Sequence, residues 1–190
     1  MTNLLKRLEA AILQHNPLLA LEYLKPGLSV KALDKRFRNV SGNVGPLRML
    51  YAWRDGTEFV NLVPGETFVA GISKVSFFPV DTFLFKDSEQ AIAMMDTSSQ
   101  AAQRHRILKE GVGRYFPIFT GTGAKFLFDL SPASGGRIIY FNDEAEKYYQ
   151  LAYTGLDDFI SDVAQANETN SRLNFLAKRE KVPRWESGNQ

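Results

Sequence analysis

Apolar runs alternate with short turn-forming segments between residues 114 and 153. The apolar runs are Tyr115–Phe119, Ala124–Leu130, Arg137–Phe141 and Tyr148–Tyr153. The segments that separate them are rich in Gly, Ser, Pro and Asn, and they are Thr120–Gly123, Ser131–Gly136 and Asn142–Glu144. Short runs of this kind, bounded by turn residues, are typical of strands joined by tight connections. The pattern predicts four consecutive antiparallel strands.

Helical periodicity dominates the first fifty residues. A first helix is predicted to end at Asn16-Pro17, because a 3.6-residue period is followed by Leu4, Leu5, Leu8, Ala11 and Ile12. A short helical turn over residues 18–24 is predicted next. Ser29 is placed to cap another helix, whose buried side is formed by Val30, Leu33 and Phe37. Pro46 favours the start of a further helix, which is predicted to end at Asp55-Gly56.

The helix after Ser29 carries a basic side, formed by Lys31, Lys35, Arg36 and Arg38. A solvated helix face and a binding patch are the two interpretations of such a cluster. Because the whole chain has a formal net charge of only +2, we favour the solvated face.

The middle of the chain is less regular. One or two short strands are predicted between residues 58 and 85, and Pro64 and Pro79 favour edge strands or loops there. A helical pattern begins at Ser88 and is predicted to continue through His105 to Leu108.

The clearest amphipathic helix follows the four strands, with apolar residues at Leu156, Phe159, Ile160, Val163 and Ala164. Thr154–Asp157 resembles a capping box at its start. Asn170 is predicted to cap a last helix. Residues 1–180 are therefore predicted to form a single domain, and residues 181–190 a flexible tail. Helices, then hairpin-linked strands, then helices again indicate an α+β domain with an antiparallel, mostly meander sheet of about four to six strands.

Composition excludes several classes of site. The 190 residues include no cysteine, which excludes disulfides, thiolate metal sites and a cysteine nucleophile.

No segment resembles a signal peptide or a membrane span, so we expect a cytoplasmic protein without a membrane partner. The near-neutral charge gives no argument for nucleic acid as a partner.

No catalytic motif is recognisable, and we expect no metal and no cofactor. Gly121–Lys125 lacks the spacing of a phosphate-binding loop and is interpreted as a hairpin turn. His15 and His105 are the only histidines, and neither has a metal-ligand partner nearby in sequence. The acidic residues at the start of the amphipathic helix, Asp157, Asp158 and Asp162, are explained by the helix dipole.

Two residues have competing interpretations. Asp129 interrupts an apolar strand, so it is either an acceptor for neighbouring loop N–H groups, which we favour, or part of a functional site. Trp53 is either a residue that covers the edge of the core, which we favour, or a binding anchor.

The order of these elements resembles the SUKH superfamily, which includes fungal regulators of cell-wall synthesis and bacterial immunity proteins of polymorphic-toxin systems. The segments that carry the resemblance are Leu24–Ser29, Leu50–Gly56, Tyr115–Phe119, Phe126–Leu130, Gly136–Phe141 and Leu156–Ile160. The chain departs from the family pattern at Asp55, where the family usually has Asn.

The resemblance implies a non-enzymatic α+β binding domain whose expected partner is a cognate toxin. Anchors of such an interface are expected among aromatic and charged residues, and the candidates are Trp53, Arg54, Asp55, Tyr115, Lys125, Asp129, Tyr140 and Tyr149. A regulatory scaffold in cell-wall synthesis or signalling is the alternative, and an enzyme or small-ligand binder with its site at Asp129 is a third hypothesis. Whether the chain forms a homo-oligomer stays open.

Overall fold

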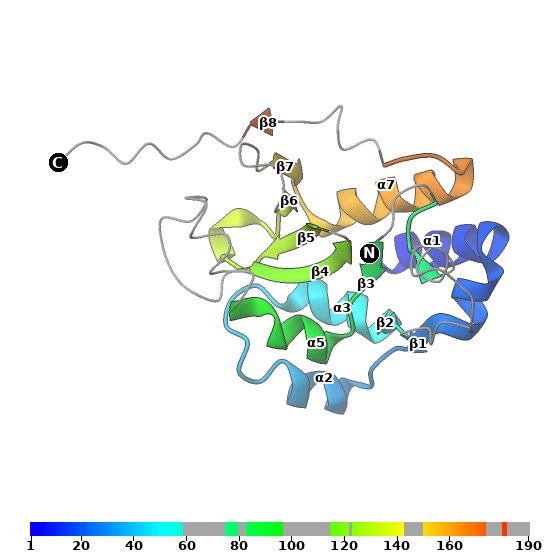
Figure 1. Cartoon of the computed structure of the whole chain (residues 1–190). Coiled ribbons are helices and arrows are strands. Elements are labelled where there is room, and N and C mark those ends of the chain that lie inside the picture. The colour runs from blue at the N-terminus through cyan, green and yellow to red at the C-terminus, as the bar shows by residue number, and fades with distance from the viewer. Residues whose placement is uncertain are drawn as a thin grey trace.

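The computed structural model describes residues 1–58, 75–79, 83–96, 115–121, 123–142, 150–173 and 180–181. Helices lie on both sides of an antiparallel sheet (Figure 1), so the fold is α+β, as the sequence predicts. The predictions for Pro64, His105 and Tyr149 fall outside the described residues.

Six strands form the main sheet in the order β3-β4-β5-β6-β7-β8, and every neighbouring pair is antiparallel. Their bounds are Phe83–Phe85, Tyr115–Gly121, Ala124–Asp129, Ile138–Asn142, Gln150–Tyr153 and Glu180–Lys181. The four predicted strands are β4 to β7, and their meander order is confirmed. Lys181, predicted to begin a tail, pairs with Gln150 in β8.

The pairing of β4 with β5 explains its proline and the turn that follows it. Pro117 lies where the register with β5 shifts, between the pairs Pro117–Leu127 and Phe119–Phe126. A proline fits such a bulge because it has no N–H to contribute to the ladder. The chain then reverses between Gly121 and Ala124, with Gly123 at φ +68°. The interpretation of Gly121–Lys125 as a hairpin turn is confirmed.

The N-terminal helices largely follow the predicted pattern. Their bounds are Thr2–His15 for α1, Leu19–Tyr23 for the π-helix η1, Val30–Arg36 for α2 and Gly45–Trp53 for α3. Ser29 Oγ accepts the N–H of Ala32 and caps α2, as predicted. Val30, however, is 72% exposed instead of buried, because the first residue of this short helix extends beyond the core that Leu33 and Phe37 reach.

A second, two-stranded sheet joins β1, Leu24–Pro26, to β2, Arg54–Thr57. The prediction that Asp55-Gly56 ends the preceding helix is wrong. The helix α3 ends at Trp53, and Asp55 and Gly56 lie inside β2. Contacts with a distant segment, described below, hold them there.

The remaining helices are α5, Ser88–Ala93, and α7, Leu156–Thr169. The predicted capping box of α7 is wrong, because its N-cap is Gly155 and no side chain caps it. Asn170 does not start a helix: at φ 49° it ends α7 in the left-handed conformation, which Asn tolerates better than most residues. Asp162 is buried and accepts a hydrogen bond from the Tyr153 hydroxyl, so the helix dipole alone does not explain it.

Aromatic side chains fill the core on both faces of the sheet. Phe116 of β4 contacts Phe37 and Tyr51 on the side of α2 and α3, at 5.9 and 5.8 Å between ring centroids. Phe119 of the same strand contacts Phe159 of α7 at 5.6 Å. Because β4 is covered on both faces, it is apolar along its length instead of alternating.

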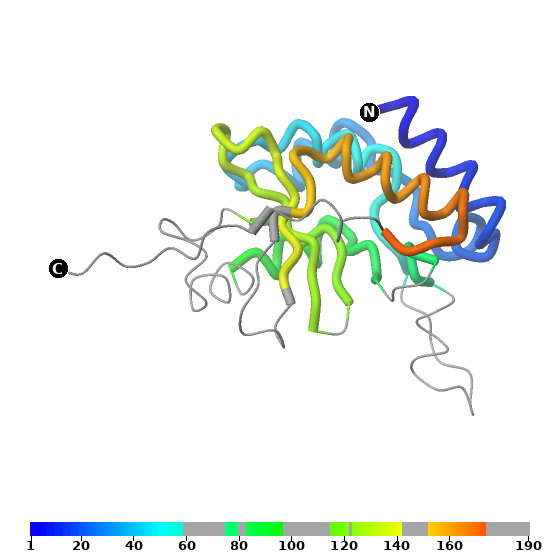
Figure 2. Tube along the Cα trace, turned by 90° about the horizontal axis from the view of Figure 1, so that it is seen from above, coloured from blue at the N-terminus to red at the C-terminus, as the bar shows by residue number. Residues whose placement is uncertain are grey.

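Helix α1 lies beside α7, and the two run in the same direction (Figure 2). The N-terminal ammonium of Met1 pairs with Asp157 at 3.3 Å, and Arg7 pairs with Glu168 at 2.6 Å. The apolar side of α1 is buried, as predicted for Leu5, Leu8, Ala11 and Ile12.

Candidate functional site

The adjacent candidates Trp53, Arg54 and Asp55 lie where α3 ends and β2 begins. Trp53 Nε1 donates a 3.0 Å hydrogen bond to Glu9 Oε2 of α1, and Arg54 Nη2 pairs with the other oxygen of that carboxylate. The indole ring also meets Phe77 edge-on, with 6.3 Å between ring centroids. Trp53 and Arg54 thus attach this junction to α1, and Trp53 covers the edge of the core as favoured above.

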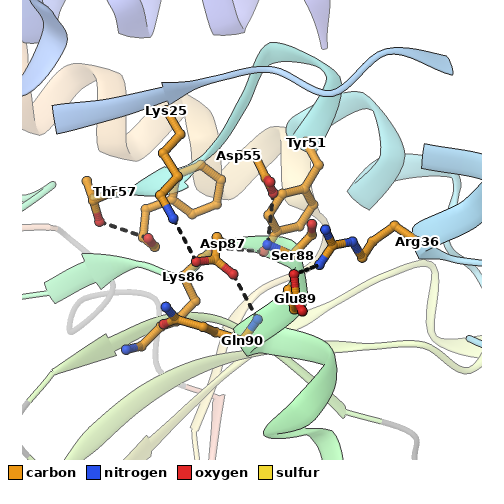
Figure 3. A network of polar contacts seen from close by, with 11 residues as sticks. Lys25, Arg36, Tyr51, Asp55, Thr57, Lys86, Asp87, Ser88, Glu89 and Gln90 are labelled. Atoms are coloured by element: carbon orange, nitrogen blue, oxygen red, sulfur yellow. Dashed lines mark hydrogen bonds and ion pairs between the residues drawn. The ribbon is translucent and has the colours of Figure 1, made fainter. Parts of the chain in front are cut away.

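Asp55 points the other way, toward the start of α5. Its Oδ1 accepts the Ser88 N–H at 2.9 Å (Figure 3). Asp87, the N-cap of α5, accepts the Gln90 N–H through Oδ1 at 2.8 Å and the Lys25 ammonium through Oδ2 at 2.9 Å. Both carboxylates therefore satisfy N–H groups that the first turn of a helix leaves without partners.

Three further contacts bind the neighbouring elements to the same segment. The Tyr51 hydroxyl donates to the Lys86 carbonyl at 3.0 Å, and Arg36 pairs with Glu89 at 2.7 Å. Thr57 Oγ1 donates to the Phe85 carbonyl at 2.8 Å. We call this network the α5 clamp, and its members are Lys25, Arg36, Tyr51, Asp55, Thr57, Lys86, Asp87, Ser88, Glu89 and Gln90. It ties β1, α2, α3 and β2 to α5.

Gly56 lets the backbones of β2 and the α5 segment approach each other within the clamp. It has φ +86°, and a Cβ built on it would lie 2.3 Å from Asp87 N and 2.5 Å from Asp87 Cα. Only glycine combines that conformation with so close a backbone contact. The residue type at position 56 is therefore required by the packing.

For Asp87 and Lys86 of the clamp, burial shifts the pKa in one direction and neighbouring groups shift it in the other. Burial alone would raise the pKa of Asp87, but the hydrogen bond from Gln90 N–H and the contact with Lys25 outweigh it, so the pKa is lowered. Burial lowers the pKa of Lys86, against the opposing effect of Asp87. Burial raises the pKa of Tyr51 well above its usual value, and the charges of Asp55 and Asp87 add to this. Asp87 is therefore held as a carboxylate and Tyr51 as a neutral hydroxyl donor.

Asp87→Asn tests the charge of this cap. Because the folded-state pKa is lowered, the Asp87 carboxylate stabilises the protein above its unfolded pKa of about 4, and this stabilisation is lost as the pH falls through the lower folded-state pKa. The amide retains the capping oxygen but not the ion pair, so we expect a loss of about 1–2 kcal/mol at neutral pH that disappears in acid. Urea unfolding of the unmodified protein and of Asp87→Asn across the pH range measures this difference in the free energy of unfolding. Glu89→Gln, at an exposed ion pair, is the control and should cost less than about 0.5 kcal/mol.

Asp129 is buried at the end of β5, where the connection to β6 begins. Its Oδ1 accepts the Ser131 N–H at 2.9 Å, and its Oδ2 accepts Arg137 Nε at 3.0 Å. The Ser134 hydroxyl donates to its backbone carbonyl at 3.1 Å. The favoured interpretation, an acceptor for loop N–H groups, is confirmed, and both carboxylate oxygens are engaged within the chain.

The other candidates lie on the main sheet, apart from Tyr149, which lies outside the described residues. Tyr115 is buried on β4, opposite Asp129 of β5. Lys125 Nζ lies 5.3 Å from the ring centroid of Phe141, and the half-buried Tyr140 contacts the Phe126 ring at 5.3 Å. The structure thus places Trp53, Arg54 and Asp55 at one junction, and Tyr115, Lys125, Asp129 and Tyr140 on the neighbouring strands β4, β5 and β6.

No protein-family model matches the chain, and no curated protein is significantly similar to it. Within the described ranges, no group of three or more His, Cys, Asp or Glu side chains is arranged to hold a metal ion. The helices in these ranges are too short or too polar for any of them to cross a bilayer. The resemblance to the SUKH superfamily therefore rests on the motif residues.

Sequence reasoning missed Glu9, the partner of Trp53 and Arg54, and the Lys25–Asp87 ion pair of the α5 clamp. Asp87 carries a recognisable signal, because an acidic residue three positions before Gln90 at the start of a helical pattern resembles a capping box. Glu9 and Lys25 carry no such signal. Glu9 contacts Trp53 across 44 residues, and Lys25 contacts Asp87 across 62 residues.

Proposed function

We propose that the protein is a non-catalytic binding domain that neutralises a cognate bacterial toxin by binding to it. The observation that carries this proposal is that the motif residues of the SUKH resemblance have definite roles in an α+β meander. Gly56 permits the approach of Asp87, and Asp129 holds the β5–β6 connection. Gly136, at φ +80°, leaves space for the Phe128 ring, which a Cβ would approach to 2.7 Å.

The α5 clamp supports a binding role because it fixes the positions of several surface elements. Helices α2, α3 and α5 are joined by hydrogen bonds and ion pairs as well as by the aromatic core. A surface that is rigid before binding loses little conformational entropy on association. An inhibitor that acts by covering its target needs a surface of this kind.

Co-expression with the toxin encoded beside its gene tests the proposal. We expect cells that produce the toxin to survive when the protein is present, and the two purified proteins to form a stable complex of unchanged covalent mass. Rescue should be retained by Gly135→Ala, since a Cβ at this loop position meets nothing within 4 Å. Absence of rescue and of a complex, with folded protein present, would contradict the proposal. A toxin recovered with a chemical modification would indicate an enzyme instead.

A further inference from the structure

Exposed apolar and basic side chains occur together on α2, α3 and the turn that follows α2. Val30 is 72% exposed and Met49 is 45% exposed, and Ala52 of α3 is also exposed. Exposed large apolar side chains near one another are a recognised feature of interaction sites. We call this surface the α2–α3 face, and it comprises Val30, Met49 and Ala52 with the basic residues Lys31, Lys35, Arg38 and Arg48.

Two sets of contacts place the two segments that carry these apolar residues side by side. At one end, Leu28 N donates to the Tyr51 carbonyl at 2.8 Å, and a Cβ on Gly27 would lie 1.9 Å from the Ala52 carbonyl oxygen. At the other end, Arg48 of α3 pairs with Asp34 of α2. The chain from Gly27 to Asp34 therefore runs alongside residues 48–52. Val30 lies within the first of these two segments, and Met49 lies within the second.

Three of the four basic residues of this face form no ion pair within the described part of the chain. Arg36 pairs with Glu89 of α5, and Arg48 pairs with Asp34. Lys31, Lys35 and Arg38 are exposed, and among the described residues no carboxylate forms an ion pair with them. Lys31 and Lys35 are one helical turn apart, so both lie on the same side of α2.

Figure 1 shows α2 as the outermost helix on the side of the sheet that α3 and α5 also cover. The inner residues Leu33 and Phe37 are buried, which leaves the opposite side of α2 toward solvent. Leu33 and Phe37 hold this helix in the core, and Arg36 adds an exposed ion pair with Glu89 of α5. The α2–α3 face is therefore both accessible and fixed in position.

We propose that the α2–α3 face docks a partner protein through an acidic surface that surrounds an apolar side chain of that partner. Apolar residues at the centre with charged residues around them are the usual arrangement of a protein interface. The unpaired cations call for negative charge on the partner. A nucleic acid fits less well, because Asp34 and the exposed Val30 and Met49 interrupt the basic surface that a phosphate backbone requires. The identity of that partner as a toxin rests on the proposed function, but the chemistry of the surface does not.

Binding of defined probes to the purified protein tests the inference. The probe is a short amphipathic peptide with leucine on one face and glutamate on the other. Polyglutamate, duplex DNA and vesicles that contain phosphatidylglycerol are the comparisons. Backbone amide shifts locate the binding, and titrations at low and high salt measure the dissociation constant. We expect the peptide to shift Val30, Lys31, Met49 and Ala52, to bind more tightly than the other three probes, and to weaken at high salt.

Matched variants test whether binding depends on the α2–α3 face or on any exposed apolar or basic residue. Val30→Asp and Lys35→Glu should each weaken peptide binding about tenfold. Leu21→Asp changes an apolar residue of η1 that is 74% exposed, and Lys6→Glu changes an exposed cation of α1, so both should leave the affinity within about twofold. All four positions are accessible, so the variants should fold. Equal effects of the two pairs would overturn the inference. Failure of the peptide to bind, binding elsewhere, or tighter binding of DNA or vesicles would also overturn it.

Hydrogen exchange on a complex with the toxin distinguishes this inference from the proposed function. Protection of residues 28–38 and 45–52 would support both. Protection elsewhere would overturn the assignment of the α2–α3 face and leave toxin binding intact. If the toxin is neither bound nor neutralised, the proposed function fails, and the peptide titration still decides whether the α2–α3 face binds acidic protein surfaces.

Discussion

Gly56→Ala is expected to destabilise the protein by about 3–4 kcal/mol, because a positive φ disfavours any side chain and the added Cβ overlaps the backbone of Asp87. The overlap is with backbone atoms at 2.3 and 2.5 Å, which cannot rotate away as the end of a side chain can. Relief requires β2 to move away from α5, and that movement would break the hydrogen bond between Asp55 and Ser88 N. Chemical denaturation followed by circular dichroism measures the loss.

Gly135→Ala separates the two causes. Gly135 has a similar conformation, φ +66°, but a Cβ there meets nothing within 4 Å. It therefore carries only the conformational cost, about 1 kcal/mol. Equal losses in the two variants would show that the approach of β2 to Asp87 contributes nothing to the requirement for glycine at position 56.

Asp129→Ala is expected to cost about 2–3 kcal/mol, because it leaves the buried Ser131 N–H without an acceptor and Arg137 without its partner. Asp129→Asn retains an oxygen for Ser131 and should cost less, about 1–2 kcal/mol. Urea unfolding midpoints of the two variants show which of the two losses of stability is larger.

Asp34→Ala is the control for Asp129, since it removes a carboxylate whose ion pair with Arg48 is at the surface. Its expected cost is below about 0.5 kcal/mol. A cost as large as that of Asp129→Ala would contradict the view that burial of the acceptor, and not the loss of an ion pair as such, makes Asp129 important.

The strands were predictable where the signals are local. The hairpin between β4 and β5 and the connection between β5 and β6 are marked by glycines that take positive φ values, Gly123, Gly135 and Gly136. A meander needs no long-range information beyond these turns, because each strand pairs with the next. The order of β4 to β7 followed from the alternation of apolar runs and turn residues.

Errors occurred where a distant segment overrides a local signal. Asp55-Gly56 has the sequence of a helix end or a turn, yet contact with Asp87 and Ser88 draws it into a strand. Asn170 was expected to start a helix because its side chain suits an N-cap, but it also suits the left-handed C-cap that it occupies. Sequence alone does not decide between two roles that the same side chain can fill.

The residues of the candidate site were predictable, but their contacts were not, because these contacts join segments that are distant in sequence. Trp53, Arg54 and Asp55 were candidates because the resemblance covers Leu50–Gly56 and implies aromatic and charged anchors, and all three do make specific contacts. The direction in which these side chains point was not predictable, because their partners Glu9 and Ser88 lie on elements whose positions depend on the whole fold. Of the α2–α3 face, only the basic side of α2 was predicted, since the exposure of Val30 depends on where α2 begins relative to the core.

The parallel pairing of α1 with α7 has a consequence for the order in which the protein is made. The apolar stripe of α1 is synthesised first, but its partner residues, from Asp157 to Glu168, emerge about 150 residues later, which takes on the order of 10 s at ribosomal rates. During that interval Leu5, Leu8 and Ile12 lack the helix that covers them in the finished protein. We therefore expect the nascent chain to depend on chaperones until α7 leaves the ribosome, and a circular permutant that places α1 after α7 to be released from that dependence.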